Sequence, residues 1–174
     1  YTLNEYNRQA FENMAHTDSL TGLNNRRCFE YLAQQLVQQN LVRPAPMSLL
    51  VFDVDHFKQI NDRYGHDIGD QVLQTIALST HSEMRQHDIL ARYGGEEFIA
   101  FLPETSLDDA LKIAERLRHK IENIVIDLDS QHRFSFSISI GAAILESCET
   151  NLLTLIKQAD IALYQAKANG RNRV

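Results

Sequence analysis

Residues 89–102 read ILARYGGEEFIAFL, and this stretch decides the fold of the chain. Two short apolar runs flank the pair Gly94-Gly95, and glycine readily adopts the positive φ angles that tight hairpin turns need. We therefore predict an antiparallel hairpin with strands over residues 89–93 and 96–102. The pair Glu96-Glu97 then lies just past the turn, at the tip of this hairpin.

A second strand is predicted over residues 47–54, and its middle is the apolar run 49–52. Because apolar residues occupy both odd and even positions, this strand is expected to be central and covered on both faces. Asp53 lies next to the last residue of this predicted strand, and Asp55 follows two residues after Asp53. The period of two along a strand places both carboxylates on one side, where they could hold a hard, oxygen-loving cation.

Helices are predicted wherever apolar residues recur every three to four positions. This spacing occurs over residues 1–16, 26–39, 68–84, 107–121 and 152–166. Bulky and small side chains alternate over residues 134–140, which predicts one more strand. Gly170 is placed to end the last helix, and residues 171–174 are expected to lead into a closing strand. Turn formers and polar residues predict loops over 17–25 and 55–69, so the whole order describes a mixed α/β domain.

The chain has 174 residues, the length of a single domain with its own core. Its 23 acidic and 17 basic side chains give a net charge of −6, which argues against a nucleic-acid-binding surface. It contains no run of about 18 apolar residues that could span a membrane. Cys28 and Cys148 lie far apart and outside any metal-binding spacing, so neither zinc nor disulfide chemistry is expected.

The two acidic pairs favour a shared Mg²⁺ site, because Mg²⁺ takes few protein carboxylates and completes its shell with substrate phosphates. Each pair taken alone is more typical of solvated carboxylates at a strand end or hairpin tip, and it is the presence of both pairs that favours the site. The chain has neither a P-loop nor a G-x-G-x-x-G motif, so other basic residues must meet any phosphates. Lys58 follows the acidic strand end, and Lys167 and Arg171 lie one helical turn apart near the end of the last helix. That last pair is also compatible with favourable charges at a helix C-terminus.

Four stretches of the chain, in the same order, resemble the GGDEF family of diguanylate cyclases. Residues 92–98 read RYGGEEF, the GGEEF form of the family signature. The other three stretches read DSLTGLNNRR over 18–27, FDVDHFKQINDRYGHDIGDQV over 52–72 and ADIALYQAKANGRNRV over 159–174. One five-residue motif is modest evidence, whereas four collinear motifs over residues 18–174 make coincidence negligible.

The resemblance implies a fold similar to nucleotidyl cyclases and the polymerase palm. In that fold, helices flank a central, mostly antiparallel sheet that carries the GGEEF hairpin. Residues 17–174 are then expected to form the cyclase domain, and residues 1–16 a linker helix from a missing upstream sensory region. The implied reaction condenses two GTP molecules into cyclic di-GMP and releases two pyrophosphates.

The family pattern also implies a metal centre and a base. Asp53, the carbonyl of Val54 and Glu96 are expected to bind one or two Mg²⁺ (or Mn²⁺) ions per GTP. Glu96, with Glu97 nearby, is expected to help remove the proton of a ribose 3′-hydroxyl. Lys58 is expected to neutralise charge that grows on the transferred phosphoryl group.

Two nucleotide-binding sets follow from the same resemblance. The residues expected to bind GTP are Phe57, Lys58, Asn61, His66, Asp70, Lys167 and Arg171. Asn61 and Asp70 are expected to bind the guanine, and the three basic residues the phosphates. The sequence R-x-x-D from Arg85 to Asp88 lies where the family has an inhibitory site for its product, cyclic di-GMP. Arg116, on the following helix, is expected to contribute to the inhibitory site of a neighbouring protomer.

The implied partners are GTP, cyclic di-GMP, a second copy of the domain and a sensory domain upstream in the same chain. The expected location is the cytoplasm, where GTP is found, with a parent protein that could be anchored in the inner membrane. No contact of residues 1–174 with nucleic acid or membrane is expected. Two alternatives stay open: a module that binds GTP or cyclic di-GMP without catalysis, and a phosphoacceptor receiver domain, since Asp53 ends a buried strand.

Overall fold

The computed structural model describes residues 15–145 and 151–174. Most of the linker helix predicted over residues 1–16 lies outside this part of the chain, and its last two residues, 15 and 16, are not helical. The loop predicted over residues 17–25 is confirmed, and its two isolated bridges pair Asn24 with Thr17 and with Ala91. No helix in the described part of the chain is both long and apolar enough to cross a membrane.

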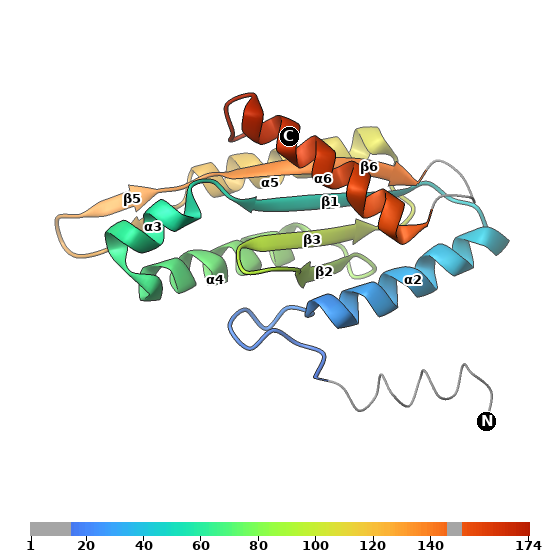
Figure 1. Cartoon of the computed structure of the whole chain (residues 1–174), viewed down its shortest axis with the longest axis horizontal. Helices are drawn as coiled ribbons and strands as arrows, with labels where there is room; N and C mark the ends of the chain where they lie inside the picture. The colour runs from blue at the N-terminus through green and yellow to red at the C-terminus, as the bar shows by residue number, and fades with distance from the viewer. Residues whose placement is uncertain (1–14, 146–150) are drawn as a thin grey trace.

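Four strands form one sheet in the order β2-β3-β1-β6, and every neighbouring pair is antiparallel. They are β1 (Met47–Val54), β2 (Ile89–Arg92), β3 (Glu97–Leu102) and β6 (Ile138–Leu145). A separate hairpin of β4 (Val125–Asp127) and β5 (Arg133–Ser135) extends from one end of the molecule, at the left of Figure 1. The antiparallel sheet confirms the expected fold and excludes a receiver domain, whose sheet is parallel.

Helices cover both faces of this sheet (Figure 1). The helices on one face are α2 (Arg26–Val42) and α6 (Leu152–Ala168), and those on the other are α3 (Phe57–Tyr64), α4 (His66–Glu83) and α5 (Leu107–Glu122). Strand β1 separates two cores, because Leu50 and Phe52 pack toward α4 and α5 while Leu49 and Val51 pack toward α2 and α6. All eight β1 residues are buried, as the run of apolar residues at both parities predicted.

Gly141 of β6 lets helix α6 lie directly on the sheet. A Cβ at this position would come within 2.1 Å of the Ala159 carbonyl oxygen and 2.4 Å of the Leu163 nitrogen, both backbone atoms of α6. Atoms cannot approach so closely, so any larger residue would push α6 away. Because α6 also carries Lys167, this contact sets the height of that side chain above the end of β1.

The hairpin is confirmed, but the predicted turn chemistry is wrong. Residues 93–96 separate β2 from β3, and neither Gly94 nor Gly95 has a positive φ angle. The loop is closed by the Tyr93 and Gly94 N–H groups, which both donate to the Glu97 carbonyl at 2.7 and 3.2 Å. A four-residue loop spreads its bend over more positions than a two-residue primed turn, so it needs no left-handed glycine.

The loop predicted over residues 55–69 is helical instead. It contains α3 and the start of α4, which meet at Gly65 with a φ angle of +91°. Helix α3 buries only Ile60 fully, so its eight residues carry too few apolar positions for a helical period to stand out.

The strand predicted over residues 134–140 is two strands. Phe134 belongs to β5, which pairs with β4, whereas Ile138 and Ile140 belong to β6, which pairs with β1. The alternation of side chains continues across both, because a change of pairing partner leaves the period of two intact. Residues 171–174, which were expected to lead into a closing strand, are not themselves a strand, although the Ile140 N–H donates to the Arg173 carbonyl at 2.9 Å.

Candidate functional site

Asp53 lies at the carboxyl end of β1, opposite Glu97 on β3 and Ser139 on β6. Residues directly opposite each other in an antiparallel pair point to the same face of a sheet, so Asp53 and Glu97 share the face covered by α6. Asp53 is 5% exposed, and its Oδ2 accepts a hydrogen bond from the Lys167 ammonium of α6. Its Oδ1 is buried and has no hydrogen-bond partner among the described residues.

Burial raises the pKa of Asp53, and this outweighs the opposite effect of the cations Lys167 and Arg171. Burial and the nearby charge of Asp53 also raise the pKa of Glu96. The pKa of Glu97 is raised by burial, then by Asp160 and Asp53. These carboxylates disfavour one another's ionised form, which is the electrostatic setting in which a divalent cation is attracted.

The donor set at Asp53 fits a hard cation. In the described part of the chain, no three acidic, histidine or cysteine side chains converge into a complete metal centre. Mg²⁺ does not need one, because it binds through one or two carboxylates together with waters and substrate phosphates. The unpartnered Oδ1 of Asp53 and the Lys167 ammonium on Oδ2 mark a carboxylate that faces positive charge. Val54 is the buried last residue of β1, and the metal-binding role of its carbonyl stays a prediction.

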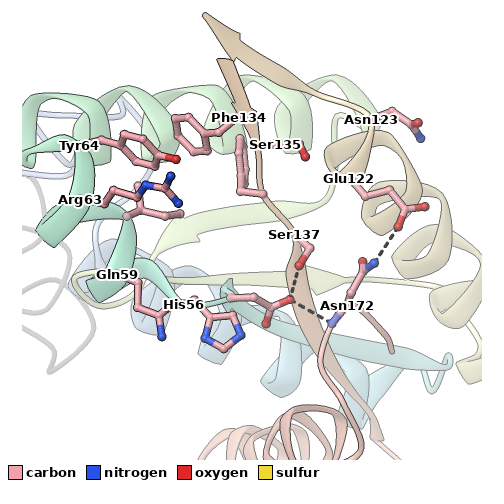
Figure 2. Close-up of a pocket in the computed structure, with 13 residues that line it drawn as sticks. His56, Gln59, Arg63, Tyr64, Glu122, Asn123, Phe134, Ser135, Ser137 and Asn172 are labelled. Atoms are coloured by element: carbon pink, nitrogen blue, oxygen red, sulfur yellow. Dashed lines mark hydrogen bonds between the residues drawn. The ribbon is translucent and has the colours of Figure 1, made fainter. Parts of the chain in front are cut away.

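Asp55 lies close enough for its charge to help raise the pKa of Asp53, but its oxygens are bound by the protein and are not open to a cation, contrary to the sequence-based expectation. Its oxygens accept hydrogen bonds from the Ser137 hydroxyl at 2.7 Å and from the Asn172 N–H at 3.0 Å (Figure 2). They also accept one from the Ser139 hydroxyl at 2.6 Å. Strand β1 ends at Val54, so the period of two no longer applies at Asp55. Its carboxylate is occupied by the protein itself.

Helices α3 and α4 bring the predicted guanine-binding residues to one junction. Asn61 of α3 packs on Gly69 of α4, where an added Cβ would lie 1.9 Å from the Asn61 Oδ1. That Oδ1 is buried and has no partner among the described residues. Asp70, the next residue of α4, is exposed, so a buried acceptor and an exposed carboxylate flank the junction.

The other predicted GTP contacts lie on these two helices and on α6. Phe57 begins α3 and approaches the same Gly69, with its Cζ 3.3 Å from the added Cβ. Lys58 is exposed on α3, and the exposed His66 is the first residue of α4. Lys167 lies near the end of α6 and Arg171 just after it, and the positive charge of each opposes the rise in the pKa of Asp53. The structure therefore brings this basic pair to the acidic end of β1.

The acidic hairpin is anchored by contacts that the sequence analysis missed. The Arg92 guanidinium donates to the Gly95 carbonyl at 3.1 and 2.6 Å and to the Asp18 carboxylate at 3.2 Å. The Tyr93 hydroxyl donates to Glu30 of α2 at 2.9 Å, and burial together with Glu30 raises the pKa of Tyr93 to about 12. The partners in these contacts are far apart in the sequence. Opposite charges occur at many positions of the chain, so charge alone could not predict which residues form these pairs.

The R-x-x-D residues form a tight turn beside a pocket of about 530 Å³. The Arg85 N–H donates to the Asp88 carboxylate at 2.7 Å, and both residues line the pocket together with residues 22–24 of the N-terminal loop. Burial raises the pKa of Asp88, although its contact with Arg85 opposes this. Arg116 does not line this pocket and pairs with Glu83 at 2.5 Å.

Comparisons with known proteins agree with these observations. The family model described as the diguanylate cyclase GGDEF domain matches residues 15–173. The chain is 43% identical over 162 residues to the response regulator PleD of Caulobacter vibrioides, an alignment that covers 92% of the chain and 36% of PleD. It is 43% identical over 166 residues to the diguanylate cyclase DgcM of Escherichia coli, covering 95% of the chain and 39% of DgcM. The chain thus spans well under half the length of these relatives.

Solved structures show the same fold. The GGDEF domain of DgcB from Caulobacter crescentus, crystallised in complex with c-di-GMP, has a TM-score of 0.88 and 31% identity, and the match covers 92% of both chains. The active GGEEF domain of a diguanylate cyclase from Vibrio cholerae has a TM-score of 0.79 and 33% identity, covering 86% of this chain and 94% of that one. A match of this extent, with the acidic hairpin paired beside Asp53, means that the chain belongs to the GGDEF domain family of diguanylate cyclases.

Proposed function

We propose that this domain condenses two GTP molecules into cyclic di-GMP and two pyrophosphates. The observation that carries the proposal is the meeting of Asp53, Glu96 and Glu97 with Lys167 and Arg171 at one end of the sheet. Carboxylates for a cation and bases for phosphates are the groups that a nucleoside triphosphate requires. The class of reaction is taken from the GGDEF family of diguanylate cyclases and from the related diguanylate cyclase DgcM.

Asp53, the Val54 carbonyl and Glu96 would hold one or two Mg²⁺ or Mn²⁺ ions. When bound, such an ion neutralises phosphate charge and lowers the pKa of a nearby hydroxyl. Glu96, with Glu97 beside it, would accept the proton of the ribose 3′-hydroxyl. The 3′-oxygen then bonds to the α-phosphorus of the second GTP, and the bond from that phosphorus to pyrophosphate breaks.

Basic residues stabilise the charge that builds up on the phosphates during this displacement. Lys58 approaches from α3, and Lys167 and Arg171 from the end of α6. Lys167 already contacts Asp53, so it exchanges that carboxylate for phosphate oxygens when nucleotide and cation arrive together. Such preorganised charge is the largest contribution that a phosphoryl-transfer site makes.

Selectivity for guanine rests on Asn61 and Asp70. The buried, unpartnered Oδ1 of Asn61 and the carboxylate of Asp70 can accept hydrogen bonds from the N–H groups of guanine's pairing edge. Adenine does not offer these donors in the same pattern and would leave the buried acceptor unsatisfied. Phe57 and His66 lie on the same two helices and would line the base-binding side.

Two copies must act together, because each domain binds one GTP and the product joins two. A two-fold arrangement places the two 3′-hydroxyls and α-phosphates reciprocally, each domain supplying half of the site. The pocket at Arg85 and Asp88 would bind the product as an inhibitor, with Arg116 contributed by the neighbouring copy. In the full-length protein an upstream sensory domain would set the distance between the two copies, in the cytoplasm, where GTP is supplied.

The direct test is to incubate the purified domain with GTP and Mg²⁺ and to identify the product by mass spectrometry. We expect cyclic di-GMP and two pyrophosphates per product, and no conversion of ATP. Asp53→Asn, which removes the metal-binding charge, is expected to yield no product. GTP binding without product at high protein concentration would contradict the proposal and favour the module that binds without catalysis.

A further inference from the structure

The segment after α6 has an unusual backbone. Gly170, Arg171 and Asn172 follow one another with φ angles of +118°, +62° and +46°. Glycine adopts this left-handed region freely and asparagine tolerates it, but a side chain like that of arginine rarely does. Arg171 therefore keeps this conformation only because neighbouring contacts hold it in place.

Asp55 supplies the contact that holds this segment to the sheet. It is 6% exposed, and it accepts hydrogen bonds from the Ser137 hydroxyl and the Asn172 N–H (Figure 2). It accepts a third from the hydroxyl of Ser139 on β6. Ser139 is fully buried, so its hydrogen bond with Asp55 is shielded from water. One carboxylate thus joins the end of β1, the start of β6 and the residue directly after Arg171.

The side chain of Asn172 gives the segment a second anchor. Its Nδ2 donates to Glu122 of α5 at 2.8 Å, and its Oδ1 accepts from Arg118 at 2.8 Å. Asp55, Glu122 and Asn172 also line a pocket of about 710 Å³ (Figure 2). Both carboxylates of this pocket are already bound by protein donors, so they serve to fasten the segment.

We propose that Asp55 is a positioning residue that sets the affinity of the domain for GTP by fixing Arg171 beside Asp53. Asp55 touches neither nucleotide nor metal, and acts through the Asn172 N–H on the arginine one residue earlier. The inference rests on the proposed function, which assigns the Arg171 guanidinium to the phosphates. It differs from the reading of Asp55 as a cation ligand, which predicts loss of metal binding instead.

Three variants test it in the whole domain. Asp55→Asn weakens the bonds and removes the charge, and Ser139→Ala removes one donor without changing any charge. Ser48→Ala is the matched control, since Ser48 is a fully buried strand serine of the same sheet that donates to the Thr105 carbonyl at 2.9 Å, away from this site. We expect the first two to raise the GTP dissociation constant by about three- to tenfold and to lower kcat/KM by at least as much, and the control to change neither.

A double-mutant cycle shows whether Asp55 acts through Arg171. In an Arg171→Ala background, Asp55→Asn is expected to change GTP affinity by less than about twofold, because the residue it positions is absent. Equal losses in both backgrounds would overturn the inference, as would Mg²⁺ binding lost in Asp55→Asn but kept in Ser139→Ala.

Hydrogen exchange separates this inference from the proposed function. The Asn172 amide proton is expected to exchange about tenfold faster in Asp55→Asn and unchanged in Ser48→Ala, whether or not nucleotide is present. Unchanged exchange in Asp55→Asn contradicts the inference alone. Failure of the wild-type domain to bind GTP, with this exchange difference intact, contradicts the proposed function alone.

Discussion

At the residue scale, Glu96 is the group on which the proposed chemistry depends most. Glu96→Gln keeps the shape of the side chain but removes the proton acceptor and one metal-binding charge. We expect the rate of cyclic di-GMP formation to fall by at least about 100-fold while GTP still binds weakly. Steady-state kinetics and equilibrium GTP binding measure the two effects. Glu104→Gln, an exposed glutamate after the end of β3, is the control, and full activity in Glu96→Gln would rule out the base assignment.

Arg85 supports a second residue-scale prediction, on product inhibition. Arg85→Ala removes a guanidinium from the pocket it shares with Asp88, so added cyclic di-GMP should lose its charged partner. We expect the inhibitory concentration of cyclic di-GMP to rise at least about tenfold and the initial rate to stay the same. Arg133→Ala, on the exposed hairpin strand β5, should leave inhibition unchanged. Unaltered inhibition in Arg85→Ala would remove the inhibitory site from this pocket.

The residues most visible in the sequence were those with family motifs, and the structure shows what such motifs cannot. Asp53 and Asp55 are equivalent as a pattern, yet one keeps a free oxygen and the other is bound by Ser137, Ser139 and Asn172. Which of two carboxylates stays open depends on donors more than 80 residues away, and no local spacing records them.

At the element scale, the placement of α6 should be sensitive to Gly141. Gly141→Ala puts a methyl group into the backbone of α6, which must shift and carry Lys167 with it. We expect the free energy of unfolding to fall by about 1–3 kcal/mol and GTP affinity to fall with it. Urea unfolding and nucleotide titration measure the two quantities. Ala143→Gly, on the same strand and face, is the control, because it should destabilise the domain without displacing α6 and so keep its GTP affinity. Equal losses of GTP affinity in both variants would contradict the inference that the distance of α6 from the sheet positions Lys167.

The link between α5 and the C-terminal segment should appear in the acid stability of the domain. Hydrogen bonds from Asn172, His119 and Arg118 lower the pKa of Glu122 from 4.5 to about 2. A lowered pKa stabilises the folded state fully above pH 4.5, and this contribution is lost as the pH falls toward 2. In Glu122→Gln we therefore expect a flatter decline of the urea midpoint across this interval. Asp108→Asn, exposed in the first turn of the same helix, is the comparison; identical acid profiles of wild type and Glu122→Gln would exclude the link.

The elements themselves could be predicted where one period is long and uniform. Strand β1 and helices α2, α4, α5 and α6 each repeat their pattern over many residues, and all were predicted close to their observed bounds. Helix α3 was missed because it buries one residue, Ile60, fully, and the join between β5 and β6 was missed because the alternation does not break there. The turn type predicted at Gly94-Gly95 was wrong for a different reason, because a Gly-Gly pair permits positive φ angles without requiring them.

At the scale of the whole molecule, a net charge of −6 is unfavourable for binding an anionic nucleotide. The positions of a few charged residues explain how the proposed substrate could still bind. The excess acid would repel a polyanion over the surface as a whole. At the end of β1, however, the proposed roles have Asp53 and Glu96 recruit cations while Lys167 and Arg171, which lie beside Asp53, meet phosphates. Net charge therefore argues against a nucleic-acid polymer, while local charge is compatible with a single nucleotide.

The last prediction follows from the proposed two-fold arrangement and concerns how activity depends on protein concentration. Because each copy supplies half of the site in the proposed mechanism, the rate per protomer should rise with protein concentration until the dimer is fully formed. Initial rates over a dilution series, compared with the mass measured at each concentration by light scattering, test this. Two copies joined by a long flexible linker should lose most of the dependence, because the linker raises their effective concentration. A rate per protomer that stays flat across the dimerisation range of the unlinked domain would mean that one copy holds the complete site.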